Sequence, residues 1–436
     1  MTVIELGEIS SGSPGPAPWH RSFQVRDIRW PALAAALALC LLGVTGSVVP
    51  EPRGLRTLWQ MPASSVPFTL TGDVLYLHTP APALEAYDAA TGRLLWRRPL
   101  DRPTDWVHTM SPGIVMLPVQ LTQPDGDSVV SEVIALDSRT GRELWRRPGE
   151  PVYGDGTRLL MATAHPSTHS LTGLQMIRAA DGAPLWSYAP GKRIAGWALV
   201  GRDPTRPESF AVVDDAGHVE LHGTADGRPT RTGSIAWQSP VDERGGDFTY
   251  LHSTGGVLFV TRQQDGKQTV TAYDPPAMRQ AWTWAADGRG GVFECGRLLC
   301  LGNVNGVRAV DPATGRAVWT SEGWEYARPL HDRRMVYETQ RGIHRQGLLD
   351  PATGAIITTF PLGVVVTDGT DGDLVLLKFL PGRPADTAVY RLLGDRLELR
   401  GRMGTVTDQG CQLARGLLAC MTRPGDDQTL VVKAVG

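Results

Sequence analysis

A short motif that recurs along the chain constrains its fold more than any other feature. Its strongest copies have an alternating apolar strand, an Asp-x-x-Thr-Gly turn and a second strand with a tryptophan four residues after the glycine. They are Leu84–Trp96, Val133–Trp145 and Val307–Trp319. An aspartate that opens a turn accepts hydrogen bonds from later backbone N–H groups, and the glycine supplies the positive φ of a type I turn with a G1 bulge. The motif therefore predicts a β-hairpin whose indole ring packs against the next repeat.

Weaker copies continue almost to the C-terminus. Trp186 ends a copy in which Arg178 stands in place of the aspartate. Trp282 ends another, in which Met278 stands in place of the glycine. A further copy, Leu349–Thr358, keeps the whole turn but has a threonine where the tryptophan would be. Two more units are degraded further: Thr224–Arg231 and Leu393–Arg400.

Two more strand-like runs lie between consecutive motifs, for example Gly72–Thr79 and Gly255–Arg262. Each unit thus contains about four short strands in roughly 37 to 51 residues, which is the period of a β-propeller blade. We expect an all-β chain that folds as a β-propeller. Segmentation gives eight internal units and one closing unit, but the unit at residues 194–234 is the least convincing. Eight blades is the expected number, with seven to nine open.

The two ends of the repeat region complement each other. Leu55–Met61 is an outer strand with a tryptophan but without preceding strands, and Thr429–Val435 is a strand without a following tryptophan strand. Together they would complete one blade and leave no exposed sheet edge. The sequence therefore predicts that the N- and C-terminal strands close the ring.

These turn-plus-tryptophan units resemble the PQQ-like repeat of propellers such as the quinoprotein alcohol dehydrogenases and the lipoprotein of the bacterial outer-membrane assembly machinery. The resemblance covers roughly residues 55–436 and implies an extracytoplasmic bacterial propeller. Resemblance to the dehydrogenases would also imply a quinone beside two adjacent cysteines and a calcium ion held by Glu, Asn and Asp. This chain has no adjacent cysteines, and its only asparagines are Asn303 and Asn305. We therefore expect no cofactor; a bound PQQ is the less favoured alternative.

The N-terminal region differs from the repeats. Residues 1–29 form a polar tail, and Trp30–Val49 is an uncharged apolar run of the length that crosses a bilayer as a helix. A buried core helix and a cleaved signal peptide are the alternatives, but no Ala-x-Ala cleavage site follows the run. We expect a single-pass protein of the cell membrane. It would have a cytoplasmic tail at 1–29, a transmembrane helix at 30–49 and an extracytoplasmic propeller at 50–436.

Four of the five cysteines form two local pairs, Cys295 with Cys300 and Cys411 with Cys420. Their spacings, without nearby histidines, match no common zinc site. Two hairpin disulfides are the plainer interpretation, and they require an oxidising compartment. Cys40 would then lie unpaired in the membrane segment.

Other candidate ligands have simpler interpretations. His165 and His169 flank a proline, while His218 and His222 would lie about 13 Å apart on a strand, too far to share one metal. Solvent-exposed histidines are the expected outcome for both pairs. The segment Asp368–Asp373 resembles a calcium loop but lacks the bidentate glutamate of an EF-hand, so we expect a hairpin turn with solvated carboxylates.

No nucleophile elbow, P-loop or haem site occurs in the repeat region, and a net charge of −2 gives no indication of a nucleic-acid partner. The sequence favours a non-enzymatic binding or scaffolding propeller with an unknown protein or cell-envelope ligand. A quinone-dependent dehydrogenase, or another enzyme with its site in the central channel, is the alternative. A sensor that signals across the membrane is a third possibility.

Overall fold

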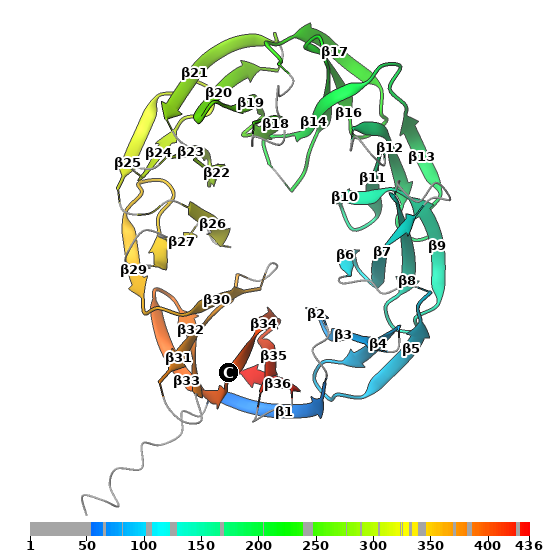
Figure 1. Cartoon of the computed structure of the whole chain (residues 1–436), viewed down its shortest axis with the longest axis vertical. Coiled ribbons are helices and arrows are strands. Elements are labelled where there is room, and N and C mark those ends of the chain that lie inside the picture. Colours follow the sequence, from blue (N-terminus) through cyan, green and yellow to red (C-terminus); the bar gives the residue numbers. More distant parts are fainter. Residues whose placement is uncertain are drawn as a thin grey trace, which may run out of the picture. The chain divides into compact units, whose positions relative to one another are not determined.

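In the computed structural model, thirty-six strands within the described residues form nine four-stranded antiparallel sheets arranged as a ring (Figure 1). The structure describes residues 54–63, 67–80, 82–101, 107–122, 129–165, 170–203, 205–238, 247–275, 277–287, 290–303, 306–322, 324, 326–330, 334–338, 346–368, 372–381, 386–423 and 428–436. Residues 52–436 form one compact unit. The PQQ-like repeats therefore build a β-propeller, as the sequence predicts.

The first five blades, each from its inner to its outer strand, follow the chain order. They are β2 (Phe68–Thr71), β3 (Val74–Thr79), β4 (Ala83–Asp88), β5 (Leu94–Pro99); β6 (His108–Ser111), β7 (Ile114–Thr122), β8 (Val129–Asp137), β9 (Glu143–Pro148); β10 (Glu150–Gly154), β11 (Arg158–Ala164), β12 (Leu171–Arg178), β13 (Pro184–Tyr188); β14 (Ile194–Val200), β15 (Ser209–Asp214), β16 (His218–Gly223), β17 (Pro229–Ser234); and β18 (Phe248–Thr254), β19 (Val257–Gln264), β20 (Lys267–Asp274), β21 (Arg279–Asp287).

The other four blades continue the same pattern until the chain returns to its start. They are β22 (Val292–Cys295), β23 (Leu298–Asn303), β24 (Gly306–Val310), β25 (Ala317–Ser321); β26 (Tyr326–Leu330), β27 (Arg334–Glu338), β28 (Gln346–Leu349), β29 (Ile356–Phe360); β30 (Val364–Thr367), β31 (Leu374–Leu380), β32 (Asp386–Leu393), β33 (Arg396–Gly404); and the closing blade of β34 (Val406–Ala414), β35 (Leu417–Thr422), β36 (Thr429–Val435) and β1 (Leu55–Pro62).

The prediction of eight blades was one too few, because residues 194–234 form a complete blade, β14–β17. Its motif is eroded: Gly223 and Arg231 occupy the aspartate and tryptophan positions. The turn nevertheless forms, since Gly227 keeps its positive φ of 69° and its N–H donates to the carbonyl of Gly223. The blade therefore keeps the turn of the motif although the aspartate and tryptophan of the motif are absent.

Ring closure occurs as predicted. β1 pairs with β36 in an antiparallel ladder from Leu55 opposite Val435 to Pro62 opposite Thr429. The backbone N–H of Gly436 donates to the carbonyl of Gly54 at 2.7 Å, where other blades have a covalent turn. Pairing of the two strands removes the free edges that an open ring would expose.

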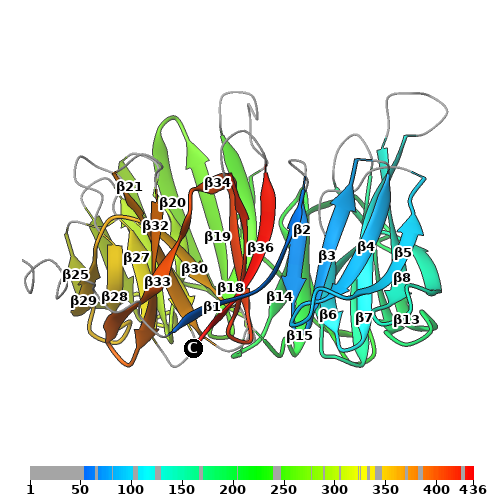
Figure 2. The same cartoon turned by 90° about the horizontal axis from the view of Figure 1, so that it is seen from below.

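The antiparallel order within each blade gives the ring two different faces. Connections from the first to the second strand and from the third to the fourth lie at one end of the blade, which we call the turn face. Connections from the second to the third strand and from blade to blade lie at the other end, the connector face. In side view the strands run between these two faces (Figure 2).

Successive blades are joined by the tryptophan of the motif. The indole ring covers the turn glycine of the next blade, so that a Cβ added at Gly141 would come within 2.6 Å of the Trp96 ring. The indole N–H donates to the carbonyl three residues before that glycine. Among the described residues this clamp occurs at six of the nine junctions: Trp59 to Ala89 (2.8 Å), Trp96 to Ser138 (2.9 Å), Trp145 to Ala179 (2.7 Å), Trp186 to Thr224 (3.1 Å), Trp282 to Pro312 (2.9 Å) and Trp319 to Pro351 (2.9 Å).

The turn that receives the indole is held by its own side chains. Asp88 Oδ1 accepts hydrogen bonds from the backbone N–H and the hydroxyl of Thr91 at 2.9 and 2.7 Å. The hydroxyl contact from Thr91 is the main reason why the pKa of Asp88 lies below its ordinary value. The same contacts recur at Asp137 with Thr140. The aspartate therefore has a structural role, as the sequence motif predicts.

The junction between β14–β17 and β18–β21 exchanges the two parts of the clamp. Met278 occupies the turn-glycine position with a φ of +49°, which non-glycine residues seldom adopt. Its buried side chain lies against Gly233 of the preceding outer strand, where a Cβ would come within 2.3 Å of Met278 Cγ. Here the bulky side chain comes from the turn and the glycine from the strand.

The predicted membrane segment at 30–49 and tail at 1–29 lie outside the described residues. In the part of the chain that the structure describes, no helix has the length and apolar character needed to cross a bilayer.

Removal of one clamp should destabilise the ring. We expect Trp145→Ala to lower the free energy of unfolding by about 3–5 kcal/mol, because the buried indole fills the space between two blades. Trp145→Phe keeps most of this packing and loses one hydrogen bond, so about 1 kcal/mol is expected. Urea unfolding followed by circular dichroism measures both; Leu185→Ala, at an exposed position, is the control. Equal stability of Trp145→Ala and wild type would contradict the role of the clamp.

Candidate functional site

Both predicted cysteine pairs form disulfides between the first and second strands of a blade. Cys411 and Cys420 lie directly opposite each other in the β34–β35 ladder, with their Cα atoms 4.2 Å apart. Cys295 and Cys300 join β22 to β23 across a two-residue turn, with Cα atoms 5.7 Å apart. In each pair the second cysteine is fully buried.

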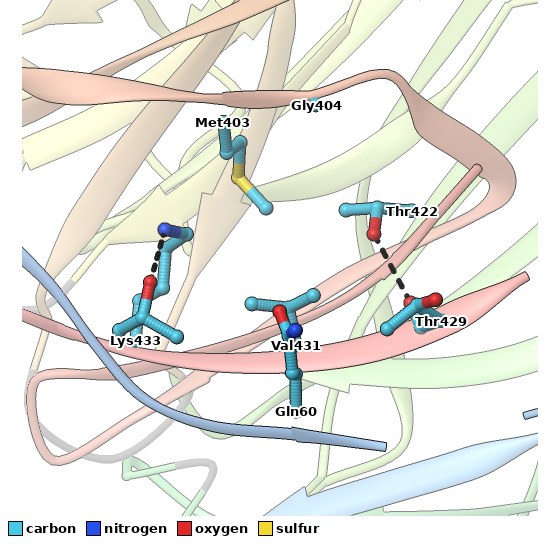
Figure 3. Close-up of a pocket in the computed structure, with 8 residues that line it drawn as sticks. Gln60, Met403, Gly404, Thr422, Thr429, Val431 and Lys433 are labelled. Carbon is cyan, nitrogen blue, oxygen red and sulfur yellow. Dashed lines mark hydrogen bonds between the residues drawn. The ribbon is translucent and has the colours of Figure 1, made fainter. Parts of the chain in front are cut away.

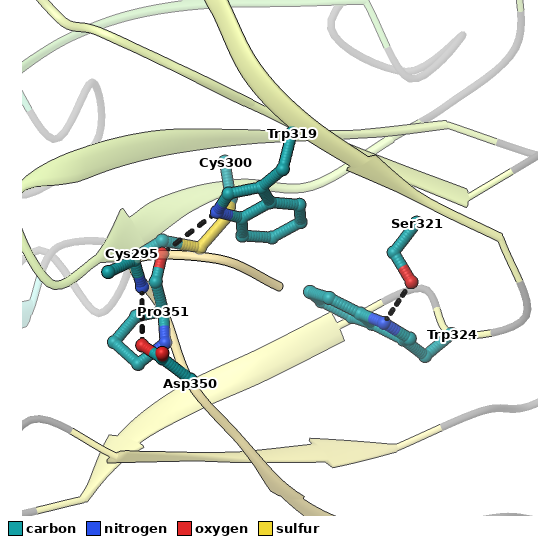
Figure 4. The surroundings of a disulfide bond; sticks show 8 residues. Cys295, Cys300, Trp319, Ser321, Trp324, Asp350 and Pro351 are labelled. Carbon is teal, nitrogen blue, oxygen red and sulfur yellow. Dashed lines mark hydrogen bonds between the residues drawn. A yellow bond between two sulfur atoms is a disulfide. The ribbon is translucent and has the colours of Figure 1, made fainter. Parts of the chain in front are cut away.

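The Cys295–Cys300 disulfide belongs to the core between two blades (Figure 4). The Trp319 ring lies beside it, with its Nε1–H donating to the carbonyl of Pro351 in the next blade. Trp324 packs in the same cluster and donates to the hydroxyl of Ser321. This disulfide reinforces a clamped junction and lines no pocket among those described.

The residues present do not fit a quinoprotein centre. The four paired cysteines are bound within single hairpins and separated by four or eight residues, whereas the quinone site needs two adjacent cysteines. No group of three or more His, Cys, Asp or Glu side chains that could hold a metal occurs among the described residues. We therefore derive no chemistry through a quinone or a calcium ion.

The expectation of solvent-exposed histidines was wrong for His222. Its ring is buried and stacks on Phe210 with the centroids 5.0 Å apart. Nδ1 lies 3.0 Å from the carbonyl oxygen of Gly227, which accepts from it, and Nε2 lies 3.1 Å from Glu220 Oε2. His218 is exposed and contacts Asp214. Both serve blade packing and turn geometry. His169 lies outside the described residues.

The expectation of solvated carboxylates in the segment 368–373 was also wrong. Asp368 is buried, and its carboxylate accepts the backbone N–H of Arg415 at 2.7 Å. Asp373 pairs with both carboxylate oxygens to Arg391 at 2.9 and 3.0 Å. The Asp368 contact joins β30–β33 to the closing blade, whereas Asp373 holds Arg391 within its own blade.

The junction between β30–β33 and the closing blade lacks both parts of the tryptophan clamp. β33 contains no tryptophan, and β32 and β33 are joined by the two-residue turn of Gly394 and Asp395. On the other side, β36 and β1 are not joined by a covalent turn at all. At the turn face, Arg391 replaces the clamp by donating to the carbonyl of Val435 at 2.8 Å. Nothing equivalent is described at the connector face of this junction.

We call the connector-face end of this junction the closure seam. One side of it consists of residues on a single face of β30–β33: Val364, Phe379, Thr387 and Met403. Their order follows from the ladder, in which Val364 pairs with Leu377, and Phe379, Thr387 and Met403 are opposite one another on successive strands. Leu362 lies in the bend just before β30. Deeper residues on the same face pack against the closing blade.

The inner end of the closure seam exposes apolar side chains. Leu362 is 65% exposed, Phe379 50% and Val364 43%. Val364 and Phe379 lie in diagonal positions on one face of adjacent strands, because Val364 pairs with Leu377, two residues before Phe379. Leu362 lies in the bend before β30, outside the ladder. Contiguous exposed apolar side chains on a soluble domain mark an interaction surface.

The outer end of the closure seam is a pocket of about 280 Å³ (Figure 3). Met403 and Gly404 line it from β33. The closing blade supplies the other six residues: Thr57, Gln60, Thr422, Thr429, Val431 and Lys433. The Cys411–Cys420 disulfide lies in the same cross-strand row as Val431 and Gln60, and therefore fixes the strands that form this wall.

Two hydrogen-bonded pairs lie at the ends of the pocket, with Val431 and Gln60 between them. Lys433 Nζ donates to the hydroxyl of Thr57 at 2.7 Å at one end. At the other end the hydroxyl of Thr422 donates to the carbonyl of Thr429 at 3.2 Å. Val431 lies between these pairs, and Met403 faces it from the neighbouring blade. None of the eight lining residues is acidic, and the one ionisable group is a cation.

A family model for the outer membrane protein assembly factor BamB matches residues 47–192 and 223–392, which is more than half of the chain. The chain belongs to this BamB-like family of PQQ-like repeat propellers. The unmatched interval lies mainly in β14–β17, the blade with the most eroded motif. No curated protein matches the chain.

Solved structures with similar folds include BamB from Moraxella catarrhalis, with 14% identity, a TM-score of 0.40, and coverage of 87% of this chain and 99% of that chain. A europium-containing methanol dehydrogenase has 11% identity, a TM-score of 0.41, and coverage of 64% and 73%. The computationally designed protein Ika8 has 13% identity, a TM-score of 0.44, and coverage of 88% and 100%. We draw no functional conclusion from similarity at this level.

No residue of the closure seam was singled out from the sequence. The available signal was indirect: the unit Leu393–Arg400 lacks both the Asp-Thr-Gly turn and the tryptophan. Two consecutive units without the complete motif would have indicated an unclamped junction. The exposure of Leu362, Val364 and Phe379 could not be predicted from the motif. It depends on how much of the sheet face the neighbouring blade covers, and the motif does not encode this.

The buried His252 provides a test of packing between β18–β21 and the next blade. Its ring lies between those of Tyr250 and Phe259, with centroids 5.2 Å from each, and neither ring nitrogen has a hydrogen-bond partner. Burial lowers the pKa of His252 to about 4. The unfolded chain has a pKa near 6.5 at this position, so it binds more protons between these values. Stability is complete above about pH 6.5 and falls as the pH decreases toward 4.

We expect His252→Phe to remove this part of the pH dependence while keeping the ring stack. Lowering the pH from 7.5 to 5 should cost wild type about 2 kcal/mol more than the variant. Urea unfolding at the two pH values measures the difference. An identical pH dependence in both proteins would show that His252 is not held neutral by burial.

The disulfides predict the thiol content of the full chain. Denaturation without reductant should expose one thiol, that of Cys40, because four of the five cysteines are paired. Reduction should then expose all five. Maleimide labelling and intact mass after rapid acid trapping of cells give these counts. Five reactive thiols before reduction would contradict both disulfides.

Proposed function

We propose that this protein is a non-enzymatic binding or scaffolding propeller, anchored in the cell membrane by residues 30–49, that holds a protein partner outside the cytoplasm. The proposal rests on the closure seam, where Leu362, Val364 and Phe379 have exposed apolar side chains at the inner end of one blade. Membership of the BamB-like family supports a role in protein binding in the cell envelope. Disulfides in two blades support an oxidising location.

The geometry of the closure seam explains why binding would occur there. At six other junctions the tryptophan clamps hold neighbouring blades against each other. At the seam, the sheet face of β30–β33 extends beyond the part packed on the closing blade. A partner that covers the exposed side chains would bury apolar surface, which contributes about 25 cal/mol per Å².

Site-specific photocrosslinking in cells tests the proposal. We expect p-benzoylphenylalanine at Phe379 to give a discrete crosslinked species, and the same label at Leu185 to give none. Leu185 is 46% exposed, similar to Phe379, but lies on the outer strand of another blade. Addition of Leu362→Asp to the Phe379 variant should remove the species, because the carboxylate would have to be desolvated on binding.

Two outcomes of the photocrosslinking experiment would contradict the proposal. No crosslink from Phe379, or one that persists with Leu362→Asp, would exclude the closure seam as the partner site. Folding of each variant is checked by its melting temperature, since exposed positions on a sheet tolerate polar substitution with little loss of stability.

A further inference from the structure

A second pocket, with a volume of about 450 Å³, lies at the turn face between the β18–β21 blade and the β22–β25 blade. Five residues of the first blade and one of the second line it: Val257, Asp274, Arg279, Gln280, Ala281 and Ala313. The outer strands of the two blades, β21 and β25, are neighbours in the ring (Figure 1). The pocket is separate from the closure seam, so its role does not depend on the proposed function.

The small side chain of Ala281 explains why a pocket forms here. Ala281 directly precedes the clamp tryptophan Trp282, and at the five other clamps this position holds a leucine or a valine. These larger residues are Leu58, Leu95, Leu144, Leu185 and Val318. A single methyl group in place of a branched side chain leaves space next to Ala313 of the neighbouring blade.

Asp274 is the turn aspartate of this repeat, but it lacks the contacts that hold the aspartate in other turns. The carboxylate of Asp88, for example, accepts hydrogen bonds from the N–H and the hydroxyl of the turn threonine. Here Ala277 stands in place of the threonine, and Pro276 before it has no N–H. The N–H of Ala277 donates to the backbone carbonyl of Asp274. No group in the part of the chain that the structure describes pairs with the Asp274 carboxylate, which can therefore bind a ligand.

Arg279 is directly opposite Asp274 in the β20–β21 ladder. Side chains at opposite positions lie on the same face of a sheet, with their Cβ atoms about 5 Å apart. The two charged groups form no ion pair with each other, and the Arg279 guanidinium has no other partner among the described residues. Both residues are exposed, so a ligand can reach them from solvent.

Most of the remaining lining is apolar. Val257 is buried, and Ala281 and Ala313 contribute methyl groups. The carboxamide of Gln280 donates to the hydroxyl of Thr283 at 3.1 Å. A ligand that matches the whole pocket has a cation for the carboxylate, an anion for the guanidinium and an apolar group for these methyl groups.

A free amino acid has this combination, because one carbon atom carries its ammonium, its carboxylate and its side chain. A ligand with only a cation, such as a lysine side chain of another protein, would pair with Asp274 but bring a second positive charge next to Arg279. A ligand with only an anion would leave Asp274 without a partner beside a second negative charge. The opposite charges on neighbouring strands thus favour a zwitterion.

We propose that this pocket binds a free α-amino acid with an apolar side chain. The Asp274 carboxylate accepts hydrogen bonds from the α-ammonium, and the Arg279 guanidinium donates to the α-carboxylate. The side chain of the ligand covers Val257, Ala281 and Ala313.

Ligand-observed NMR titration of the full-length protein with L-leucine tests the proposal. We expect saturable binding with a dissociation constant of about 1 mM, because exposed charged groups contribute little affinity each. L-leucinamide lacks the carboxylate, and 4-methylpentanoate lacks the ammonium. Each should bind about tenfold more weakly than L-leucine, since one charge-assisted contact is lost.

Two charge variants assign each contact to its residue. Asp274→Asn should weaken the binding of L-leucine about tenfold and leave that of 4-methylpentanoate unchanged, because this compound has no ammonium. Arg279→Gln should weaken the binding of L-leucine and leave that of L-leucinamide unchanged. A general loss of folding would weaken the binding of all three compounds.

A third variant fills the pocket. Ala281→Leu restores the residue that most other clamps have, so it should reduce the affinity for L-leucine more than tenfold without lowering the melting temperature. Val318→Leu makes the corresponding change in the next blade and should have no effect on binding.

Three results would overturn the inference. The first is no saturable binding of L-leucine at ten times the expected dissociation constant. The second is equal affinity for L-leucine and L-leucinamide, which would indicate a site for cations. The third is unaltered binding of L-leucine by Ala281→Leu, which would place the ligand elsewhere. Crosslinking at Phe379 has no bearing on these results, so the failure of either proposal is recognised separately.

Discussion

The contact between an indole ring and the turn glycine of the next blade is the interaction on which the rest of the structure depends. It couples sequence to architecture directly: the aspartate shapes the turn, the glycine leaves room, and the tryptophan fills it while bonding a backbone carbonyl. Each blade alone exposes two large apolar faces. Repetition of the contact covers them, so the core of this protein lies between blades and extends around the ring.

Two of the three junctions without the clamp show what the contact accomplishes. Between β14–β17 and β18–β21, Met278 and Gly233 exchange the roles of bulky residue and glycine, and the junction stays packed. Between β30–β33 and the closing blade, β33 has no tryptophan and no covalent turn joins β36 to β1; Leu55 of β1 packs against Gly401 of β33 instead. Arg391 secures only the turn face. The open seam at the connector face is therefore a consequence of how the ring closes.

Most of the fold could be predicted from the sequence, since the motif encodes a hairpin and its contact with the neighbour. The propeller, the terminal strand closure and the two hairpin disulfides all follow from local patterns. The nine blades lie within the expected range of seven to nine but exceed the favoured count of eight, because Arg231 and Gly223 replace the motif residues of β14–β17 while the backbone keeps its turn. The closure seam was missed because exposure of Leu362 and Phe379 depends on how much of β30–β33 the closing blade covers, which no local pattern records.

Hydrogen–deuterium exchange of the full-length protein tests most directly whether the clamps hold the ring and whether their absence leaves the closure junction loose. The account predicts faster exchange for the amides of β33 and β36 than for those of β9 and β13, which belong to clamped junctions, because local opening should begin where neither tryptophan nor turn is present. Equal or slower exchange in β33 and β36 would contradict the account, since the ring would then be held as firmly without the clamp as with it.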